Sequence, residues 1–237
     1  MTKVRVILVG LAMTAATAAH AGLTVTPTVT SDYDFRGISQ TAAQPALQLG
    51  VDYTTGGLHV GGWASNIEWG PFYKGSMELD AVADYSFGSD DTAKFNAGII
   101  DYTYPNMSDQ NTPEAWFTVS KKWFSGSVHY ANDWFNLNDA LYLEANGTFP
   151  INDSGFTVGV HVGNSSGSAW KHIEYTDYSV SLSKGFGNFT GSLKYVGSDA
   201  PELSSAQSLS AYGKKHVFET QDRVILSIST TLPWASK

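Results

Sequence analysis

The sequence predicts an all-β protein, an antiparallel transmembrane β-barrel of about 12 strands with up-and-down topology. Three observations predict this fold class. Apolar and polar residues alternate with a period of two in many short segments, short and long connections alternate between those segments, and an apolar leader precedes the first of them. The period-two alternation is typical of strands with one face in lipid and the other in water.

The N-terminal residues 1–21 are expected to form a secretory signal peptide. Lys3 and Arg5 precede an apolar run from Val6 to Ala19, and the small residues around Ala21 are typical of a cleavage site. The run is shorter than the roughly 18 residues that a membrane-spanning helix needs. Residues 22–237 are then expected to form one outer-membrane β-barrel domain.

The composition argues against several classes of protein. Cleavage of residues 1–21 would leave 12 basic residues against 22 acidic ones, a net charge of −10, which disfavours nucleic acid as a partner. The chain contains no cysteine, so neither disulfides nor an N-terminal lipid anchor on cysteine can stabilise or attach it.

The first strand is predicted from the alternation that begins at Leu23 and continues into the segment "SDYDFRGISQ". This pattern predicts a strand as far as Arg36, with Gly37 turning the chain into the first outer loop. Tyr33 and Phe35 would then lie in a lipid-facing aromatic girdle, and the charged residues between and beside them would face an aqueous interior.

Eleven further segments have a comparable pattern, and each is bounded by turn-forming residues. They are Pro45–Thr54, Leu58–Asn66, Ser76–Phe87, Ala93–Tyr102, Thr112–Lys121, Trp123–Asn132, Asp139–Phe149, Phe156–Asn164, Tyr175–Phe186, Phe189–Gly197 and Phe218–Leu232.

The connections between these segments favour a membrane barrel over a soluble β-sandwich. Short turns such as Thr55-Gly56-Gly57 alternate with longer loops, as periplasmic turns alternate with outer loops in outer-membrane barrels. The longer loops are Ile38–Gln44, Ile67–Gly75, Thr103–Asn111, Asp133–Asn138, Ser165–Glu174 and Ser198–Val217.

Aromatic residues gather at the ends of the predicted strands, which is typical of the interfacial girdles of outer-membrane barrels. The residues expected in these girdles are Tyr33, Phe35, Trp69, Phe72, Tyr73, Tyr102, Tyr104, Trp123, Phe124, Trp134, Phe135, Phe186 and Phe189.

Several motifs resemble one protein family. The segments "SDYDFRGISQT", "PALQLGVDY", "GWASN", "MELDAVADYSF" and "DYTYP", between Ser31 and Pro105, and "DRVILSIS" at Asp222–Ser229 resemble the TorF-type porin family, also described as Gcw-type conserved hypothetical proteins of proteobacteria. The resemblance implies a secreted outer-membrane β-barrel with a pore function. One departure is the C-terminus, where Trp234 is followed by three more residues although such barrels typically end in an aromatic residue.

The sequence contains candidate motifs for catalysis and metal binding, but it lacks the structural features that these sites require. Gly163–Gly167 has the Gly-x-Ser-x-Gly spelling of a nucleophile elbow, but that elbow requires a strand-to-helix turn, and no helical pattern follows it. We therefore predict a Gly/Ser-rich outer loop there. The histidines are not spaced as metal ligands, so we predict no catalytic residue, no metal and no cofactor.

The parity of the strands predicts which charged residues line the interior. These pore-lining candidates are Asp32, Asp34, Arg36, Asp52, Glu78, Asp80, Asp84, Lys94, Glu114, Glu144, Asp177, Lys194, Glu219 and Arg223.

Ten acidic candidates against four basic ones favour a porin-like channel for passive diffusion of small hydrophilic solutes with a weak cation preference. It would lie in the outer membrane of a Gram-negative bacterium, with lipid and solutes or cations as its partners. Two alternatives remain open at this point. One is a non-conducting barrel with a structural or loop-mediated binding role, and the other is an outer-membrane lipid hydrolase. The number of subunits does not follow from the sequence.

Overall fold

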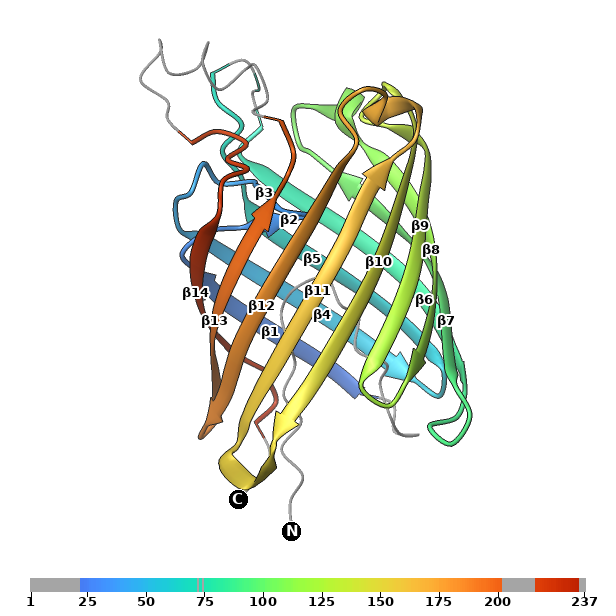
Figure 1. Cartoon of the computed structure of the whole chain (residues 1–237), viewed down its shortest axis with the longest axis vertical. Coiled ribbons are helices and arrows are strands. Elements are labelled where there is room, and N and C mark those ends of the chain that lie inside the picture. The colour runs from blue at the N-terminus through green and yellow to red at the C-terminus, as the bar shows by residue number, and fades with distance from the viewer. Residues whose placement is uncertain (1–21, 72, 74, 202–215, 235–237) are drawn as a thin grey trace.

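The computed structural model describes residues 22–71, 73, 75–201 and 216–234, and in this part of the chain strands close into an antiparallel barrel (Figure 1). The barrel contains 12 strands, and each pairs with its neighbours in the order β1-β14-β13-β12-β11-β10-β9-β8-β7-β6-β5-β4. The predicted fold class is therefore confirmed. The predicted signal peptide, Phe72 and most of the loop Ser198–Val217 lie outside the described residues.

The strand bounds agree closely with the predicted segments, except at the two ends of the chain. The barrel strands are β1 (Gly22–Thr30), β4 (Ala46–Thr55), β5 (Leu58–Asn66), β6 (Met77–Gly88), β7 (Lys94–Thr103), β8 (Thr112–Lys121), β9 (Phe124–Trp134), β10 (Asn138–Ile151), β11 (Phe156–Ser166), β12 (Tyr175–Phe186), β13 (Phe189–Ser198) and β14 (Arg223–Thr230).

The alternation of side chains explains why these segments form a closed sheet. On β12, Val180 is 53% exposed on the outside of the barrel, whereas the neighbouring Ser181 is 9% exposed. An apolar outer face and a polar inner face are what a strand needs when lipid surrounds the barrel. Closure also pairs the first strand with the last, so this sheet has no free edge.

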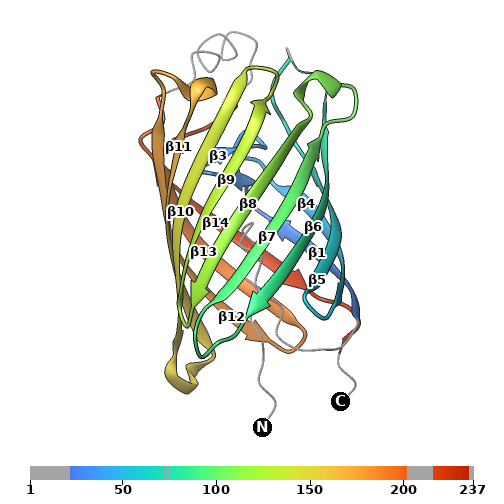
Figure 2. The same ribbon diagram turned by 90° about the vertical axis from the view of Figure 1, so that its right-hand side faces the viewer.

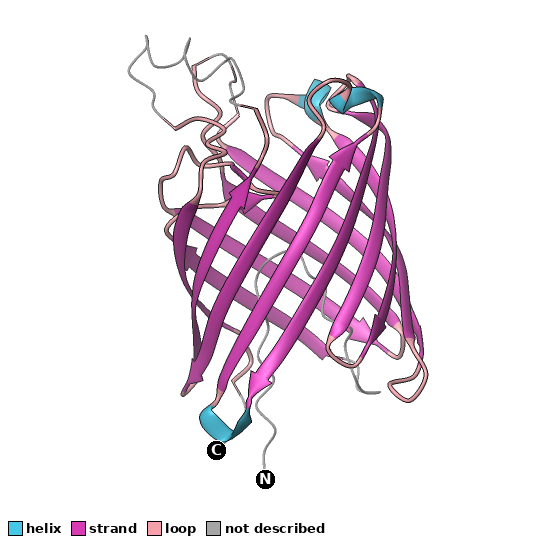
Figure 3. Cartoon of the chain, in the orientation of Figure 1, coloured by secondary structure: helices cyan, strands magenta, loops and turns pink. Residues whose placement is uncertain are grey.

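The connections divide the barrel into two unlike ends. Long connections gather at one end and short turns at the other, as Figure 2 shows. We call these the long-loop end and the short-turn end. Three short 3₁₀ turns, Ser108–Gln110, Asn152–Ser154 and Ser168–Trp170, are the helical elements of the described residues (Figure 3). Among these residues, no helix has both the length and the apolar character required to cross a membrane.

The first long connection does not extend outward. After β1 ends at Thr30, the segment Ser31–Pro45 turns into the barrel and forms a small hairpin of β2 (Asp34–Phe35) and β3 (Ile38–Ser39). We call Ser31–Pro45 the inward hairpin. The prediction of a continuous strand to Arg36 followed by an outer loop is therefore wrong. Alternation shows only which residues share a face, and a hairpin alternates as a long strand does.

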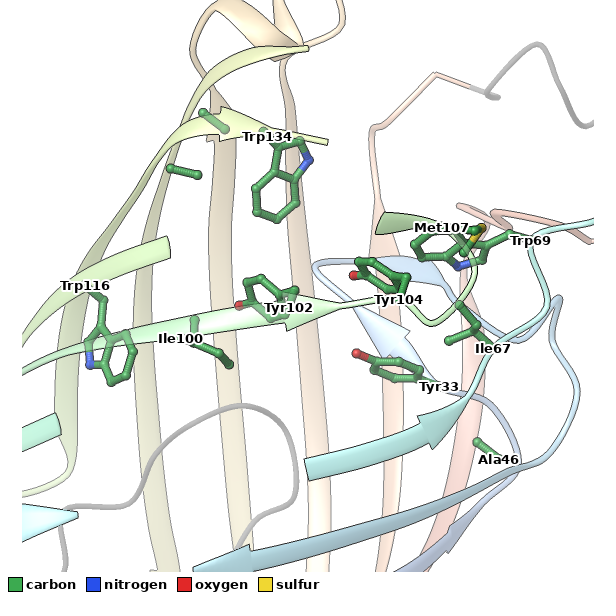
Figure 4. Packing of buried hydrophobic residues seen from close by; sticks show 12 residues of the cluster. Tyr33, Ala46, Ile67, Trp69, Ile100, Tyr102, Tyr104, Met107, Trp116 and Trp134 are labelled. Carbon is green, nitrogen blue, oxygen red and sulfur yellow. The ribbon is translucent and has the colours of Figure 1, made fainter. Parts of the chain in front are cut away.

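The inward hairpin also changes where the aromatic residues lie. Tyr33, Trp69, Tyr104 and Trp134 are buried in a cluster that Phe35 contacts, and Figure 4 shows Tyr33, Tyr102 and Tyr104 in this interior. These residues were predicted for a lipid-facing girdle, and that prediction is wrong for them. Other predicted girdle residues are exposed beside the short turns: Trp123, Phe124, Phe186 and Phe189.

Candidate functional site

The tip of the inward hairpin is pressed against the barrel wall. Arg36 and Gly37 have positive φ angles of 49° and 81°, as a tight two-residue turn requires. A Cβ atom on Gly37 would lie 2.7 Å from the Cβ of Asp177 on β12 and 2.9 Å from the Cβ of Ser198 on β13. Only glycine therefore allows the backbone to adopt this turn and to approach the wall so closely.

Arg36 extends from the hairpin tip to another part of the wall. Its Nη2 atom lies 2.8 Å from both carboxylate oxygens of Glu114 on β8. The guanidinium also lies over the rings of Phe35, Trp134 and Tyr142, at 4.8, 5.2 and 4.1 Å from their centroids. Charge pairing and cation–π contacts together hold this cation inside the barrel.

The start of the inward hairpin is fixed by a second group of ion pairs. Arg223 on β14 donates from Nε to Asp32 at 2.6 Å and from Nη2 to Asp34 at 2.5 Å. Lys194 on β13 donates to the other oxygen of Asp34 at 2.9 Å. The two aspartates that sequence parity placed in the interior are thus paired with bases rather than free.

A row of alternating carboxylates and imidazoles crosses five adjacent strands from β8 to β12. It runs from Glu114 through His129, Glu144 and His161 to Asp177, with N···O distances of 3.1, 3.5, 3.7 and 2.8 Å. We call this row the carboxylate–imidazole belt. Each histidine lies between two acids, which is an arrangement that the one-dimensional spacing of the histidines does not show.

His59 on β5 forms a similar group elsewhere on the wall. Its Nε2 atom lies 3.0 Å from Asp52 on β4, and its Nδ1 atom lies 2.6 Å from Asp84 on β6. Asn96 on β7 donates to the second oxygen of Asp84 at 2.6 Å. Sequence analysis did not identify these three interior histidines, His59, His129 and His161. Their inward parity, next to acids on adjacent strands, was the available signal.

Glu78 and Asp80 on β6 differ from the other interior acids. Tyr104 donates a hydrogen bond of 3.0 Å to Glu78, but neither carboxylate oxygen of Asp80 has a hydrogen-bond partner. Among the described residues, no Lys, Arg or His side chain lies within ion-pair distance of either acid.

The remaining predicted pore-lining residues lie near the ends of the barrel. Lys94 pairs with Asp90 at 2.7 Å beside a short turn. Glu219 precedes β14 instead of lying on a strand, so its predicted strand position is wrong. Burial would raise the pKa of Glu219, but a hydrogen bond from His216 and bonds from nearby backbone amides lower it below its usual value.

The Gly163–Gly167 motif does not form an outer loop as predicted. Gly163 to Ser166 belong to β11, where they pair with β10 and β12. A regular strand lacks the sharp turn that exposes a catalytic serine, so the motif has no elbow geometry. Among the residues that the structure describes, no group of three or more His, Asp or Glu side chains is arranged to hold a metal ion.

Comparisons with known proteins agree with this architecture. The model of the Gcw_chp family, described as bacterial protein of unknown function, matches residues 14–232. No curated protein matches the sequence significantly.

Several solved structures are similar in fold. An outer membrane channel from Pseudomonas putida F1 has a TM-score of 0.57 and 10% identity, over 94% of this chain and 99% of that one. The KdgM porin, solved with disordered oligogalacturonate, has a TM-score of 0.54 and 10% identity, over 88% and 97%. The NanC porin has a TM-score of 0.51 and 12% identity, over 89% and 98%. At these identities the similarity concerns the fold alone.

Proposed function

The chain belongs to the Gcw_chp family of bacterial proteins, and from this membership and its barrel we propose that it is an outer-membrane channel. The proposed channel allows passive diffusion of small hydrophilic solutes, prefers cations weakly and has no enzymatic activity. We also propose that the protein is a TorF-type porin.

One observation carries this proposal: the barrel is closed, with apolar side chains outside and a polar, charged interior. A polar lumen is typical of porins, whereas a soluble barrel would need the opposite arrangement. Barrels of eight strands are filled by side chains and those of 16 or more leave a wide channel, so 12 strands favour a narrow path. The inward hairpin narrows that path further.

The ion pairs refine the proposed cation preference. Asp32, Asp34 and Glu114 are paired with Arg or Lys, so they contribute little net charge. Glu78 and Asp80 have no such partner among the described residues, so in their ionised forms they would add uncompensated negative charge to the interior. At 0.1 M salt the Debye length is about 10 Å, so the preference should be modest and should weaken as salt rises.

The test is the reversal potential of the purified protein in a planar bilayer under a potassium chloride gradient. We expect a cation-selective parent and a clear loss of selectivity in Glu78→Gln/Asp80→Asn. The matched control is Asp90→Asn, because Asp90 pairs with Lys94 and its side chain is 75% exposed at a short turn. An anion-selective parent, or a double variant with unchanged potential, would contradict the proposal.

A non-conducting barrel is the second candidate function, and the inward hairpin favours it. The hairpin is tied to β8, β13 and β14 by Arg36, Lys194 and Arg223, which would make it a stable plug. Absence of conductance from a barrel that shows heat-dependent gel mobility would support this alternative. Conductance in the parent would exclude it.

A further inference from the structure

Asp80 lies in an aromatic environment on the inner wall. In the registers of the neighbouring strands, Trp63 on β5 and Tyr102 on β7 are directly opposite Asp80. Asp80 is 7% exposed, and both of its carboxylate oxygens lack a hydrogen-bond donor. An ionised carboxylate buried without donors or a counter-charge costs several kcal/mol, so a bound cation would be needed to hold Asp80 in its charged form.

The inward hairpin packs on the barrel wall next to this acid. Tyr33 packs edge-on against Trp63, with ring centroids 5.1 Å apart and an interplanar angle of 61°. Tyr33 and Tyr104 belong to one buried cluster, and Figure 4 shows their hydroxyls pointing the same way. Glu78 lies two positions before Asp80 on the same face of β6. It accepts a hydrogen bond from the hydroxyl of Tyr104.

The two acids and the aromatic rings around them indicate the kind of ligand that would bind here. The free oxygens of Asp80 require hydrogen-bond donors, the two acids require positive charge, and the faces of aromatic rings attract cations. A divalent metal ion would need more acidic or imidazole ligands than these two, and the described residues contain no such group. A primary ammonium group supplies both the charge and three N–H donors.

We infer that Asp80, Glu78, Trp63, Tyr102 and Tyr33 form a subsite for the primary ammonium group of a small organic solute. In this structure Tyr33 covers the subsite, and a small displacement of the inward hairpin opens it to the lumen. The inference rests on the proposed function and deepens it, because it names the class of solute that the channel wall binds.

Isothermal titration calorimetry of the detergent-solubilised full chain with methylammonium chloride tests the subsite. Potassium chloride at the same ionic strength is the control titrant. We expect saturable binding of methylammonium, at least about tenfold tighter than that of potassium. Equal affinities, or no saturable heat with methylammonium, would overturn the inference. Calorimetry needs no ion flow, so its failure is distinct from a failure to conduct in the bilayer.

Two matched variants locate the binding. Asp80→Asn removes the charge with little change of shape, and we expect it to weaken methylammonium binding at least about tenfold. Asp52→Asn removes another interior acid, paired with His59, and should leave the affinity unchanged. Heat-dependent gel mobility verifies that each variant folds. Unchanged methylammonium binding in Asp80→Asn, or an equal loss of binding in Asp52→Asn, would refute the assignment. If Asp80→Asn does not fold, the comparison of methylammonium with potassium on the parent protein tests the subsite.

Discussion

The Nη2 atom of Arg36 lies 2.8 Å from both carboxylate oxygens of Glu114, although 78 residues separate the two along the chain. Arg36 is at the tip of the inward hairpin, which leaves the wall between β1 and β4, whereas Glu114 belongs to β8. Five strand pairings on one side of the closed barrel and seven on the other separate β1 from β8, so this ion pair spans the interior.

Breaking this ion pair should destabilise the barrel. Glu114→Gln leaves the buried guanidinium of Arg36 without its counter-charge, and loss of one partner of a buried pair costs about 3–5 kcal/mol. Lys94→Ala, which breaks the pair with the exposed Asp90, should cost less than about 1 kcal/mol. Urea unfolding of the two variants in detergent measures the difference, and equal midpoints would argue against a structural role for Arg36.

Gly37 should tolerate alanine less well than Gly187 does. Both glycines have positive φ angles, 81° and 62°, so each substitution carries a cost of about 1–2 kcal/mol for the left-handed backbone. At Gly187 nothing lies within 4 Å of the new Cβ, whereas at Gly37 it would meet Asp177 and Ser198. Overpacking should add about 1–3 kcal/mol to Gly37→Ala. Similar unfolding free energies for the two variants would show that the tip does not press on the wall.

Neighbouring residues on β12 should respond in opposite ways to polar substitution. Val180→Arg places a charge on the lipid-facing side near the middle of the strand, at a cost of about 2–4 kcal/mol. Ser181→Asn keeps a polar group on the inner face and should change stability much less. The yield of heat-modifiable protein after refolding into detergent compares the two. A higher yield for Val180→Arg would mean that the faces are reversed.

We propose that the exported protein begins at Gly22, as the basic and apolar N-terminal residues indicate. Intact mass spectrometry of protein extracted from outer membranes should give the mass of residues 22–237. A species that retains Met1 would contradict this prediction.

Much of the barrel was predictable from local sequence. Alternation at period two, with turn residues between segments, located segments such as Leu58–Asn66 and Thr112–Lys121 with the bounds that the structure has. The same alternation put Asp80 and Glu114 on a face opposite to that of the exposed apolar residues. These properties depend on neighbours within one strand or one turn, which is why a single sequence contains them.

The path of Ser31–Pro45 depended on contacts that no local pattern records. Asp32 forms an ion pair with Arg223, which is 191 residues away in the sequence, and Gly37 lies against β12 and β13. These partners lie close together only after the barrel closes, so a hairpin that enters the lumen and a strand that continues outward have the same alternation before folding. Closure of the sheet, with its long-range ion pairs and aromatic packing, therefore decided that Tyr33 and Phe35 lie inside the barrel instead of facing lipid.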